Sequence, residues 1–436
     1  MKRKGKFKTH DRISALDDAH AAIAPYAHHL RIVLADPDDL LRFEKVCHVA
    51  ECEPRPIRIA RISALEKQFF TRLELDRIQR WIGTMDWKSA FQIEAFLRCG
   101  LLNTHDLRTL QLPIEDVIRD YGAEASELLR LFSVELKIRQ PDEDPKDCLA
   151  RVRMKHPTLK PLRLTQGLIS CHHIIITPSR ILLEGPYATH SNRIIRRYQS
   201  RDAALVERFI RVEFRDEDRL SYRWEAHVDG SWLLQQRVGG ILRDGFTIGG
   251  RPFEFLAYSM SALREHSVWF VAPFRDPEEG YVTAEKIRAS LGNFSKLLRT
   301  PSKYAARIAQ AFTSTYPNVK ICLSQWEVQP ELGPHTDGVG TISPKLAAMI
   351  WEANCKVSGN RDRIEPSAYQ FRFLGYKGVV VVDRRLKGIK MRLRESQCKF
   401  LALNDEEAEF EIARAFDYPN PAYLNRFVAL YFLNLG

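Results

Sequence analysis

The sequence predicts an α+β protein in which a helical N-terminal region precedes a longer, strand-rich region. Through the first 150 residues, apolar side chains recur at three- and four-residue steps, the spacing of one face of a helix. Beyond them, short runs rich in valine, isoleucine and aromatic residues are separated by glycine, proline or charged turns, as strands are. The 436 residues exceed one typical core, so we expect three regions: 1–150, 151–320 and 321–436.

The helical region contains three predicted segments, over residues 65–81, 87–101 and 114–136. In the third, every third or fourth residue is apolar, including Ile114, Val117 and Leu128. The segment 140–146 (QPDEDPK) is polar and rich in proline and acid, which favours a boundary there.

The second part is expected to alternate short strands with a few helices. A helix is predicted over 303–312, where Tyr304, Ile308 and Phe312 form one apolar stripe. An apolar pattern over 421–435 predicts a last helix. The predicted strands lie within residues 168–183, 209–214, 253–258, 268–271, 369–373, 379–382 and 389–393.

The net charge of +11 is distributed unevenly along the chain. Residues 1–150 carry 24 Lys and Arg against 25 Asp and Glu, whereas residues 151–436 carry 42 against 30. Two windows supply the excess, 151–200 with 9 against 1 and 351–400 with 12 against 5. Concentrated positive charge favours a polyanionic partner such as a nucleic acid, although a charged face that only keeps the protein in solution fits equally well.

Several other classes of protein are disfavoured. No run of eighteen apolar residues occurs, and the basic start lacks the apolar stretch of a secretory signal, so we expect an intracellular protein, nuclear or cytoplasmic, with reduced thiols. The closest cysteines, Cys47 and Cys52, have no matching His or Cys pair for zinc. Signatures of P-loop nucleotidases, α/β hydrolases and zinc proteases are absent.

The first candidate for a functional residue is Lys377, a lysine with a glycine on either side. In Gly375-Tyr-Lys-Gly-Val379, glycines stand on both sides of Lys377 and a run of valines follows. Glycine has no Cβ, so a phosphate or another backbone can approach closely, and the lysine adds a point charge. A strand that is entered through a glycine turn, with a solvated lysine, remains the alternative.

A row of cations is the second candidate. If residues 389–394 form a strand, alternation places Lys390, Arg392 and Arg394 on one face and apolar residues on the other. Such a strand suits the lining of an RNA channel, and equally any half-exposed sheet. Asp337 could bind a metal, but Asp-Gly is a common tight-turn pair, so we interpret Asp337 as a turn residue rather than as a metal ligand.

Read in order, short pieces from about residue 174 to 436 resemble the eukaryotic, cell-encoded RNA-dependent RNA polymerases of RNA silencing. No single piece is specific, but their order and spacing agree over the whole stretch, and residues 87–102 resemble the helical segment that precedes it in the family. The pieces are Thr177-Pro-Ser-Arg180, Gly185-Pro186, Ser191-Asn-Arg193, Phe209-Ile-Arg-Val-Glu-Phe214, Gly249-Gly-Arg251, Phe253-Glu-Phe-Leu-Ala-Tyr-Ser259, Leu263-Arg264, Trp269-Phe270, Lys303-Tyr-Ala-Ala-Arg307 with Gln310, Asp337-Gly-Val-Gly340, Ile342-Ser343, Pro366-Ser-Ala-Tyr-Gln370, Gly375-Tyr-Lys-Gly-Val379, Lys399-Phe400 and Tyr423-Leu-Asn-Arg426.

The resemblance implies a fold and roles for several residues. Such polymerases carry two double-psi β-barrels that face each other, and residues 321–436 are expected to hold the first. Lys377 and Lys399 match its two basic positions, which face nucleotide phosphates and the RNA 3′ end. Lys390, Arg392 and Arg394 would contact the RNA backbone.

The resemblance also implies what this sequence does not carry. In the family, the second barrel holds Mg²⁺ on a D-x-D-G-D loop, and no such motif occurs in these 436 residues. We therefore expect an N-terminal portion of the polymerase, without metal ligands and inactive by itself.

The expected function of the complete enzyme is that of an RNA-directed RNA polymerase, a nucleotidyltransferase that copies single-stranded RNA with ribonucleoside triphosphates. Its double-stranded product would be cut into siRNA, with silencing-pathway proteins as possible partners and no membrane. The alternative is a non-catalytic RNA-binding or partner-binding module derived from such a polymerase. A subunit of a DNA-templated polymerase fits less well, because the matched pieces belong to the RNA-templated family.

Overall fold

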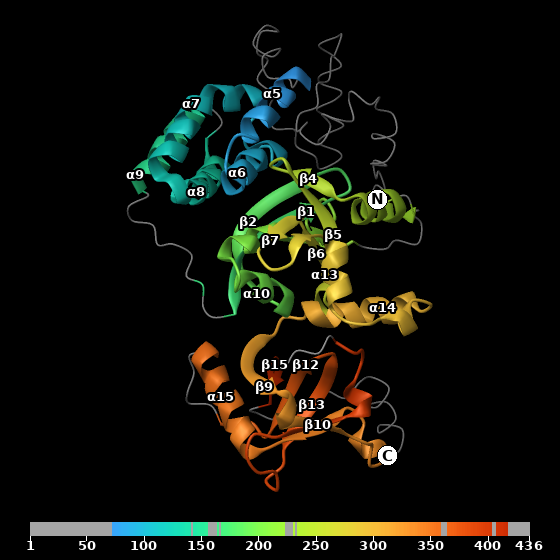
Figure 1. Cartoon of the computed structure of the whole chain (residues 1–436). Helices are drawn as coiled ribbons and strands as arrows, with labels where there is room; N and C mark the ends of the chain where they lie inside the picture. The colour runs from blue at the N-terminus through green and yellow to red at the C-terminus, as the bar shows by residue number, and fades with distance from the viewer. Residues whose placement is uncertain are drawn as a thin grey trace, which may run out of the picture.

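The computed structural model describes residues 72–140, 143–155, 164, 167–222, 230–231, 233–358, 364–402 and 407–416 (Figure 1). A helical region, a six-stranded sheet and a seven-stranded sheet follow one another along the chain. This order confirms the predicted α+β class. The predicted helix over 421–435 lies outside the described residues, as do Cys47 and Cys52. None of the helices in the described ranges is long and apolar enough to cross a membrane.

The helical region is built from amphipathic segments with defined ends. Asp86 caps α6 by accepting a hydrogen bond from the Ser89 N–H, and Asn103 and Asp106 form a reciprocal capping box on α7. Gly122, with a φ of 50°, separates α7 from α8 within the predicted segment 114–136. The helices are α5 (Arg72–Ile82), α6 (Trp87–Arg98), α7 (Thr104–Tyr121), α8 (Ala125–Ile138) and α9 (Pro145–Lys155).

Helix α6 joins the helical region to the first sheet. Its residues Trp87 and Phe91 are buried in one apolar core with strands of that sheet. The Trp87 indole N–H donates to the Ile248 carbonyl at 3.0 Å, and the Glu94 carboxylate accepts from the Gly249 N–H at 2.6 Å. The opposite face of α6 packs on α7 and α8, so this helix is buried on nearly all sides. Helix α9 runs past the predicted limit at residue 150 and packs on α8.

The first sheet has the strand order β2-β1-β3-β6-β5-β4. Strand β1 runs parallel to β3, and every other neighbouring pair is antiparallel. Two segments later in this part of the chain matter for the site: helix α13 (Ala284–Ser290) and helix α14 (Pro301–Ile308). The strands are β1 (Leu168–Ile176), β2 (Ile181–His190), β3 (Phe209–Phe214), β4 (Phe246–Ile248), β5 (Arg251–Ala257) and β6 (Ser267–Val271). Short helices α10 (Arg193–Gln199), α11 (Gly239–Asp244) and α12 (Met260–Arg264) lie between them, and a separate hairpin, β7 (Phe274–Asp276) and β8 (Gly280–Val282), follows β6.

The second sheet curls into a nearly closed barrel, with the strand order β10-β14-β11-β13-β12-β15-β9 (Figure 1). Its two edge strands are consecutive in the chain and are separated only by Leu323–Gln325, so the edges of the sheet meet at that connection. Pairs β10–β14 and β11–β13 are parallel. The elements are β9 (Tyr316–Cys322), β10 (Trp326–Gln329), β11 (Val339–Ile342), α15 (Pro344–Ser358), β12 (Ala368–Phe373), β13 (Tyr376–Val382), β14 (Met391–Arg394) and β15 (Glu407–Ala415).

One buried glutamine joins the crossing segments of the barrel. The Gln397 side chain is fully buried; its carbonyl accepts from the Arg394 N–H at 2.8 Å, and its amide donates to the carbonyls of Gly338 and Val379. Gly378 lies so close that a Cβ there would stand 2.4 Å from the Gly338 oxygen. The glycine therefore serves close backbone packing.

Candidate functional site

Lys377, the first predicted site residue, lies within a strand. The strand predicted over 379–382 begins earlier, at Tyr376, so Lys377 is a half-buried strand residue of β13 and not part of a turn. In the antiparallel hairpin β12–β13 its direct cross-strand partner is Arg372. Opposite residues of an antiparallel pair share a face of the sheet, so the two cations project from the same side.

The backbone of Lys399 lies beside the turn of that hairpin, close to Lys377. Its backbone N–H donates to the Gly375 carbonyl at 3.0 Å, and the neighbouring Cys398 forms an isolated bridge with Tyr376. The Lys399 ammonium donates to the Ser396 carbonyl. The structure thus brings Lys377 and Lys399 together.

Helix α14 packs beside these two lysines. Phe294 contacts both Tyr304 of this helix and Phe400, which follows Lys399, with ring centroids 5.6 and 4.9 Å apart. This packing fixes α14 beside the barrel and places Arg307 within electrostatic reach of Lys377. Burial lowers the pKa of Lys377, and the positive charges of Arg372, Arg307 and Lys399 lower it further.

Three hydrogen-bond donors of this cluster have no partner in the described part of the chain. They are the buried Nε atoms of Arg307 and Arg372 and the amide nitrogen of Gln310, one turn after Arg307. Buried donors in native proteins are rarely left unsatisfied, so a bound acceptor is one way in which these three donors would be satisfied. Burial also lowers the pKa of Arg372, against the opposing charge of Glu411.

We define the phosphate cluster as Arg307, Gln310, Arg372, Lys377 and Lys399. Its chemistry is that of an anion site: positive charge that is partly removed from water. Guanidinium groups bind phosphate oxygens in a planar, two-pronged manner, and lysines add point charges. Such a site can hold a triphosphate or offset charge that develops on a phosphoryl group.

Lys390, Arg392 and Arg394, which were predicted to share one face of a strand, do not form one exposed row. Strand β14 begins at Met391, so Lys390 precedes it and is exposed. Arg392 is ion-paired with Glu327 at 2.7 Å. Arg394 is only 8% exposed and donates to the Pro330 carbonyl. Their contacts with RNA stay a prediction.

Asp337 lies in a turn, as predicted, and Gly338 after it has a φ of 71°. Within the ranges that the structure describes, no three His, Cys, Asp or Glu side chains come together as metal ligands.

Sequence reasoning missed the roles of Arg307, Gln310 and Arg372. A signal for Arg372 was present: in Tyr369-Gln-Phe-Arg-Phe373 the aromatic residues are buried, so alternation places Gln370 and Arg372 on the opposite face. Arg307 and Gln310 belong to a piece that matches the family, but no role was predicted for them, because the proximity of Arg307 to Lys377 depends on tertiary packing.

Comparisons with known proteins agree on one family. The model of the family described as "RNA dependent RNA polymerase" matches residues 176–436. RNA-dependent RNA polymerase 1 of Arabidopsis thaliana is 34% identical over 295 residues, covering 65% of this chain and 25% of that protein. The probable RNA-dependent RNA polymerase 1 of Oryza sativa subsp. japonica is 34% identical over 271 residues, 59% of this chain and 34% of that protein.

A more distant relative is RNA-dependent RNA polymerase 1 of Schizosaccharomyces pombe, 31% identical over 251 residues, covering 55% of this chain and 19% of that protein. The chain therefore spans between a fifth and about a third of the length of these relatives. Among solved structures, the RNA dependent RNA polymerase QDE-1 from Thielavia terrestris matches with 17% identity and a TM-score of 0.46, over 69% of this chain and 37% of that one.

Proposed function

The chain belongs to the RNA-dependent RNA polymerase family, and from this premise we propose that it supplies the cationic half of the catalytic cleft of an RNA-directed RNA polymerase. The complete enzyme would copy single-stranded RNA from ribonucleoside triphosphates into double-stranded RNA for siRNA production. The observation that carries the proposal is the phosphate cluster, whose residues all fall within the part of the chain that the family model matches.

In this proposal the lysines act as fixed charges. Lys377 and Lys399 face the phosphates of the incoming nucleotide, while Arg307 and Arg372 donate their free Nε–H groups to phosphate oxygens. Because these charges are fixed before the nucleotide binds, little reorganisation is needed when negative charge develops on the transferred phosphoryl group. We assign Lys377 and Lys399 as catalytic residues and the two arginines as substrate-binding residues.

Mg²⁺, which the family implies, does not fit the phosphate cluster. The group consists of four cations and an amide, whereas Mg²⁺ binds carboxylates and phosphates. We propose that its ligands are supplied from outside these 436 residues and that the isolated chain binds nucleotide without forming phosphodiester bonds.

Two measurements test this function. In the complete enzyme, Lys377→Ala should lower nucleotide incorporation by about 10²-fold or more, the loss seen when one preorganised stabilising group is removed. In this chain, the same change should weaken ATP binding, measured by calorimetry in EDTA. Exposed Lys387, in the turn after β13, provides the matched control as Lys387→Ala. Near-normal incorporation and unchanged ATP affinity with Lys377→Ala would contradict the assignment.

A further inference from the structure

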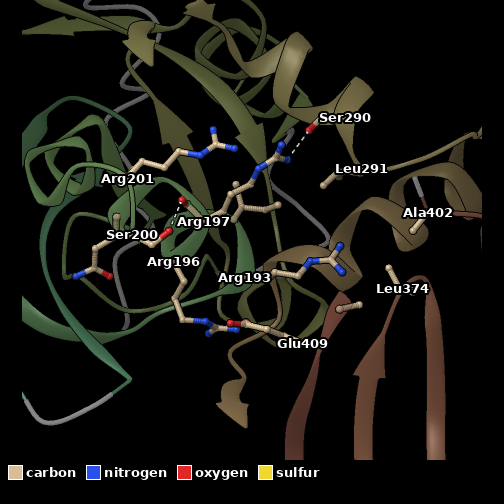
Figure 2. Close-up of a pocket in the computed structure, with 13 residues that line it drawn as sticks. Arg193, Arg196, Arg197, Ser200, Arg201, Ser290, Leu291, Leu374, Ala402 and Glu409 are labelled. Carbon is tan, nitrogen blue, oxygen red and sulfur yellow. Dashed lines mark hydrogen bonds between the residues drawn. The ribbon is translucent and has the colours of Figure 1, made fainter. Parts of the chain in front are cut away.

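An arginine-rich cavity of about 660 Å³ lies between the first sheet and the barrel (Figure 2). On one side α10 and the residue pair after it contribute Arg193, Arg197 and Arg201. On the other side the turn of the β12–β13 hairpin contributes Leu374, and β15 contributes Glu409. The cavity therefore spans two separately built parts of the fold.

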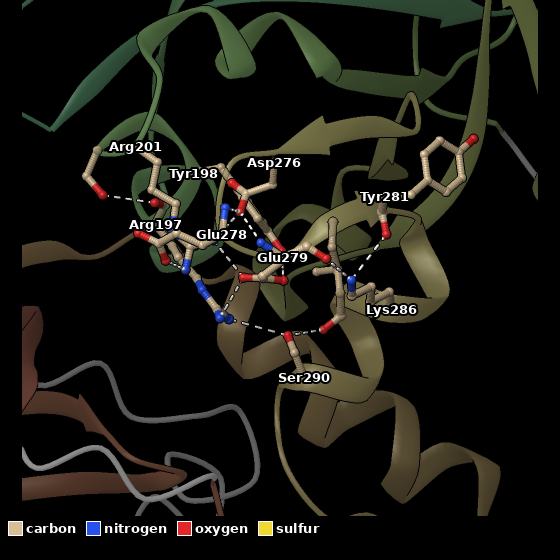
Figure 3. Close-up of polar contacts among 11 residues, drawn as sticks. Arg197, Tyr198, Arg201, Asp276, Glu278, Glu279, Tyr281, Lys286 and Ser290 are labelled. Carbon is tan, nitrogen blue, oxygen red and sulfur yellow. Dashed lines mark hydrogen bonds and ion pairs between the residues drawn. The ribbon is translucent and has the colours of Figure 1, made fainter.

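Two of these arginines are fixed by acids that do not line the cavity (Figure 3). Arg197 pairs with Glu279 at 2.8 Å, and Arg201 pairs with both Asp276 and Glu279, at 2.9 and 2.7 Å. The Asp276 side chain is fully buried and that of Glu279 is 16% exposed. The acids thus hold the guanidinium groups from behind, while the arginines themselves border the open space.

Further contacts add rigidity to this arrangement. The guanidinium carbons of Arg197 and Arg201 lie 5.8 and 5.6 Å from the ring centroid of Tyr198, which is fully buried. Arg197 also donates to the hydroxyl of Ser290, the last residue of α13, at 3.4 Å. The Lys286 ammonium donates to the carbonyls of Glu279 and Tyr281 and so holds the turn that carries the acids. Side chains fixed in this way lose little entropy when a ligand binds.

Arg193 differs from its neighbours because its side chain makes no hydrogen bond or ion pair with any residue in the described ranges. Figure 2 shows its guanidinium extending toward Leu374 and Ala402 across the cavity. Glu409 is the single acid among the lining residues, against four arginines. The lining is therefore net positive, with one guanidinium fork available for a ligand.

The remaining lining restricts the chemical class of that ligand. No aromatic side chain lines the cavity, so a nucleobase would find no ring to stack on. Arginine forks instead match phosphate oxygens. Leu374 stands only three residues before Lys377, so the cavity and the phosphate cluster both border the β12–β13 hairpin.

We propose that this cavity binds a phosphate of the sugar–phosphate backbone of an RNA strand, with Arg193 as the principal contact and Arg197 as the second. The proposal rests on the proposed function in taking RNA as the ligand. It adds a site outside the phosphate cluster, at the junction of the first sheet with the barrel, and this site recognises RNA independently of base sequence.

The test is binding of fluorescein-labelled single-stranded RNA to the 436-residue chain, followed by anisotropy over a series of salt concentrations. Arg193→Gln should lower the affinity about five- to tenfold at low salt and reduce the slope of log K against log salt by about one, the signature of one lost phosphate contact. Arg193→Lys should restore the slope because it keeps the charge. The control is Arg243→Gln, since Arg243 on α11 is 68% exposed and pairs only with the adjacent Asp244 among described residues.

The outcomes separate this proposal from the proposed function. If Arg193→Gln and Arg197→Gln leave RNA affinity unchanged while Lys377→Ala still weakens ATP binding, the cavity proposal is overturned and the function stands. If Arg193→Gln weakens RNA binding but Lys377→Ala leaves ATP binding intact, the phosphate cluster is misassigned and the cavity site stands. A chain that binds no RNA at any salt concentration overturns the cavity proposal.

Two competitors identify the source of the anion. ATP that displaces labelled RNA from the wild-type chain, but not from the Arg193→Gln variant, would show that the cavity binds a free triphosphate. That result overturns the assignment to RNA. Displacement by hexaglutamate with the same dependence on Arg193 would show a site for an acidic peptide and would overturn it as well. Displacement by unlabelled RNA alone supports the proposal.

Discussion

Arg372 on β12 and Lys377 on β13 are direct cross-strand partners, so two positive side chains lie opposite each other on one face of the barrel. Like charges in this position destabilise a sheet. Removing the charge at 377 should therefore stabilise the chain while it weakens phosphate binding. We expect Lys377→Met to raise the free energy of unfolding by about 0.5–1 kcal/mol, measured by urea denaturation. Lys377→Arg, which keeps the charge, is the control; a destabilised Lys377→Met would contradict the expectation.

The titration of Lys377 gives a second prediction. Its pKa is lowered from the ordinary 10.5 by burial first and by the three nearby cations second. Since the folded pKa lies below the unfolded one, the unfolded chain binds more protons between them, so this lysine contributes stability that rises with pH through that window. NMR of ¹³C-labelled lysine should show a midpoint below 10.5 that moves upward when tripolyphosphate is added. A midpoint at or above the ordinary value would contradict the clustered arrangement.

Acid sensitivity should depend on a buried histidine of the first sheet. His172 contacts the rings of Trp87 and Phe91, with centroids 4.8 and 4.4 Å away, and burial lowers its pKa from 6.5 to about 3. Its folded pKa is depressed, so stability is lost as pH falls from about 6.5 toward 3, by up to about 1.4 kcal/mol per pH unit. His172→Phe should flatten that part of the stability profile, and exposed His335→Gln should not. Equal slopes for both variants and the wild type would contradict this.

A buried ion pair connects α10 to the barrel. Arg196 pairs with Glu411 at 2.9 Å and donates to the Thr315 carbonyl at 2.6 Å, and the two charged side chains are 14% and 4% exposed. Arg196→Ala leaves the Glu411 carboxylate buried without its cation, which should cost about 3–5 kcal/mol of unfolding free energy.

The double variant Arg196→Ala with Glu411→Gln should recover part of the stability that Arg196→Ala loses, since the buried charge is removed with its partner. Thermal unfolding of the three proteins measures this, and a double variant that is less stable than Arg196→Ala would contradict the pairing.

Local pattern predicted several of the elements, but it missed others, among them helices α9 and α15 and strands β9 and β15. Strand β3 has the bounds that alternation predicted, 209–214, because its side chains alternate between buried and partly buried positions. The strand around Lys377 was predicted too short, since Gly375 and Gly378 indicated turns, whereas close backbone packing requires the second glycine. Periodicity also showed that α6 is amphipathic, but it could not show that both a helical layer and a sheet cover this helix.

The candidate site was predicted only in part, for a physical reason. Glycines flank Lys377 in the sequence, whereas Lys399 was assigned from the resemblance to the family, and the roles of both lysines stay predictions. Arg307 lies seventy residues before Lys377 and approaches it through the packing of Tyr304, Phe294 and Phe400. Such proximity depends on tertiary structure, and no local pattern records it. The same holds for the arginines of α10 and the acids that fix them.

The pairing of the first strand of the barrel with its last limits the order in which the protein can fold. Strand β9 pairs with β15, so residue 316 must wait for residue 412 before its hydrogen bonds are made. The first sheet, by contrast, has all its strands within residues 168–271. During synthesis the first sheet and α6 can therefore become native while the barrel segment is still emerging from the ribosome, and the slow, long-range step of folding falls to the domain that carries the lysines.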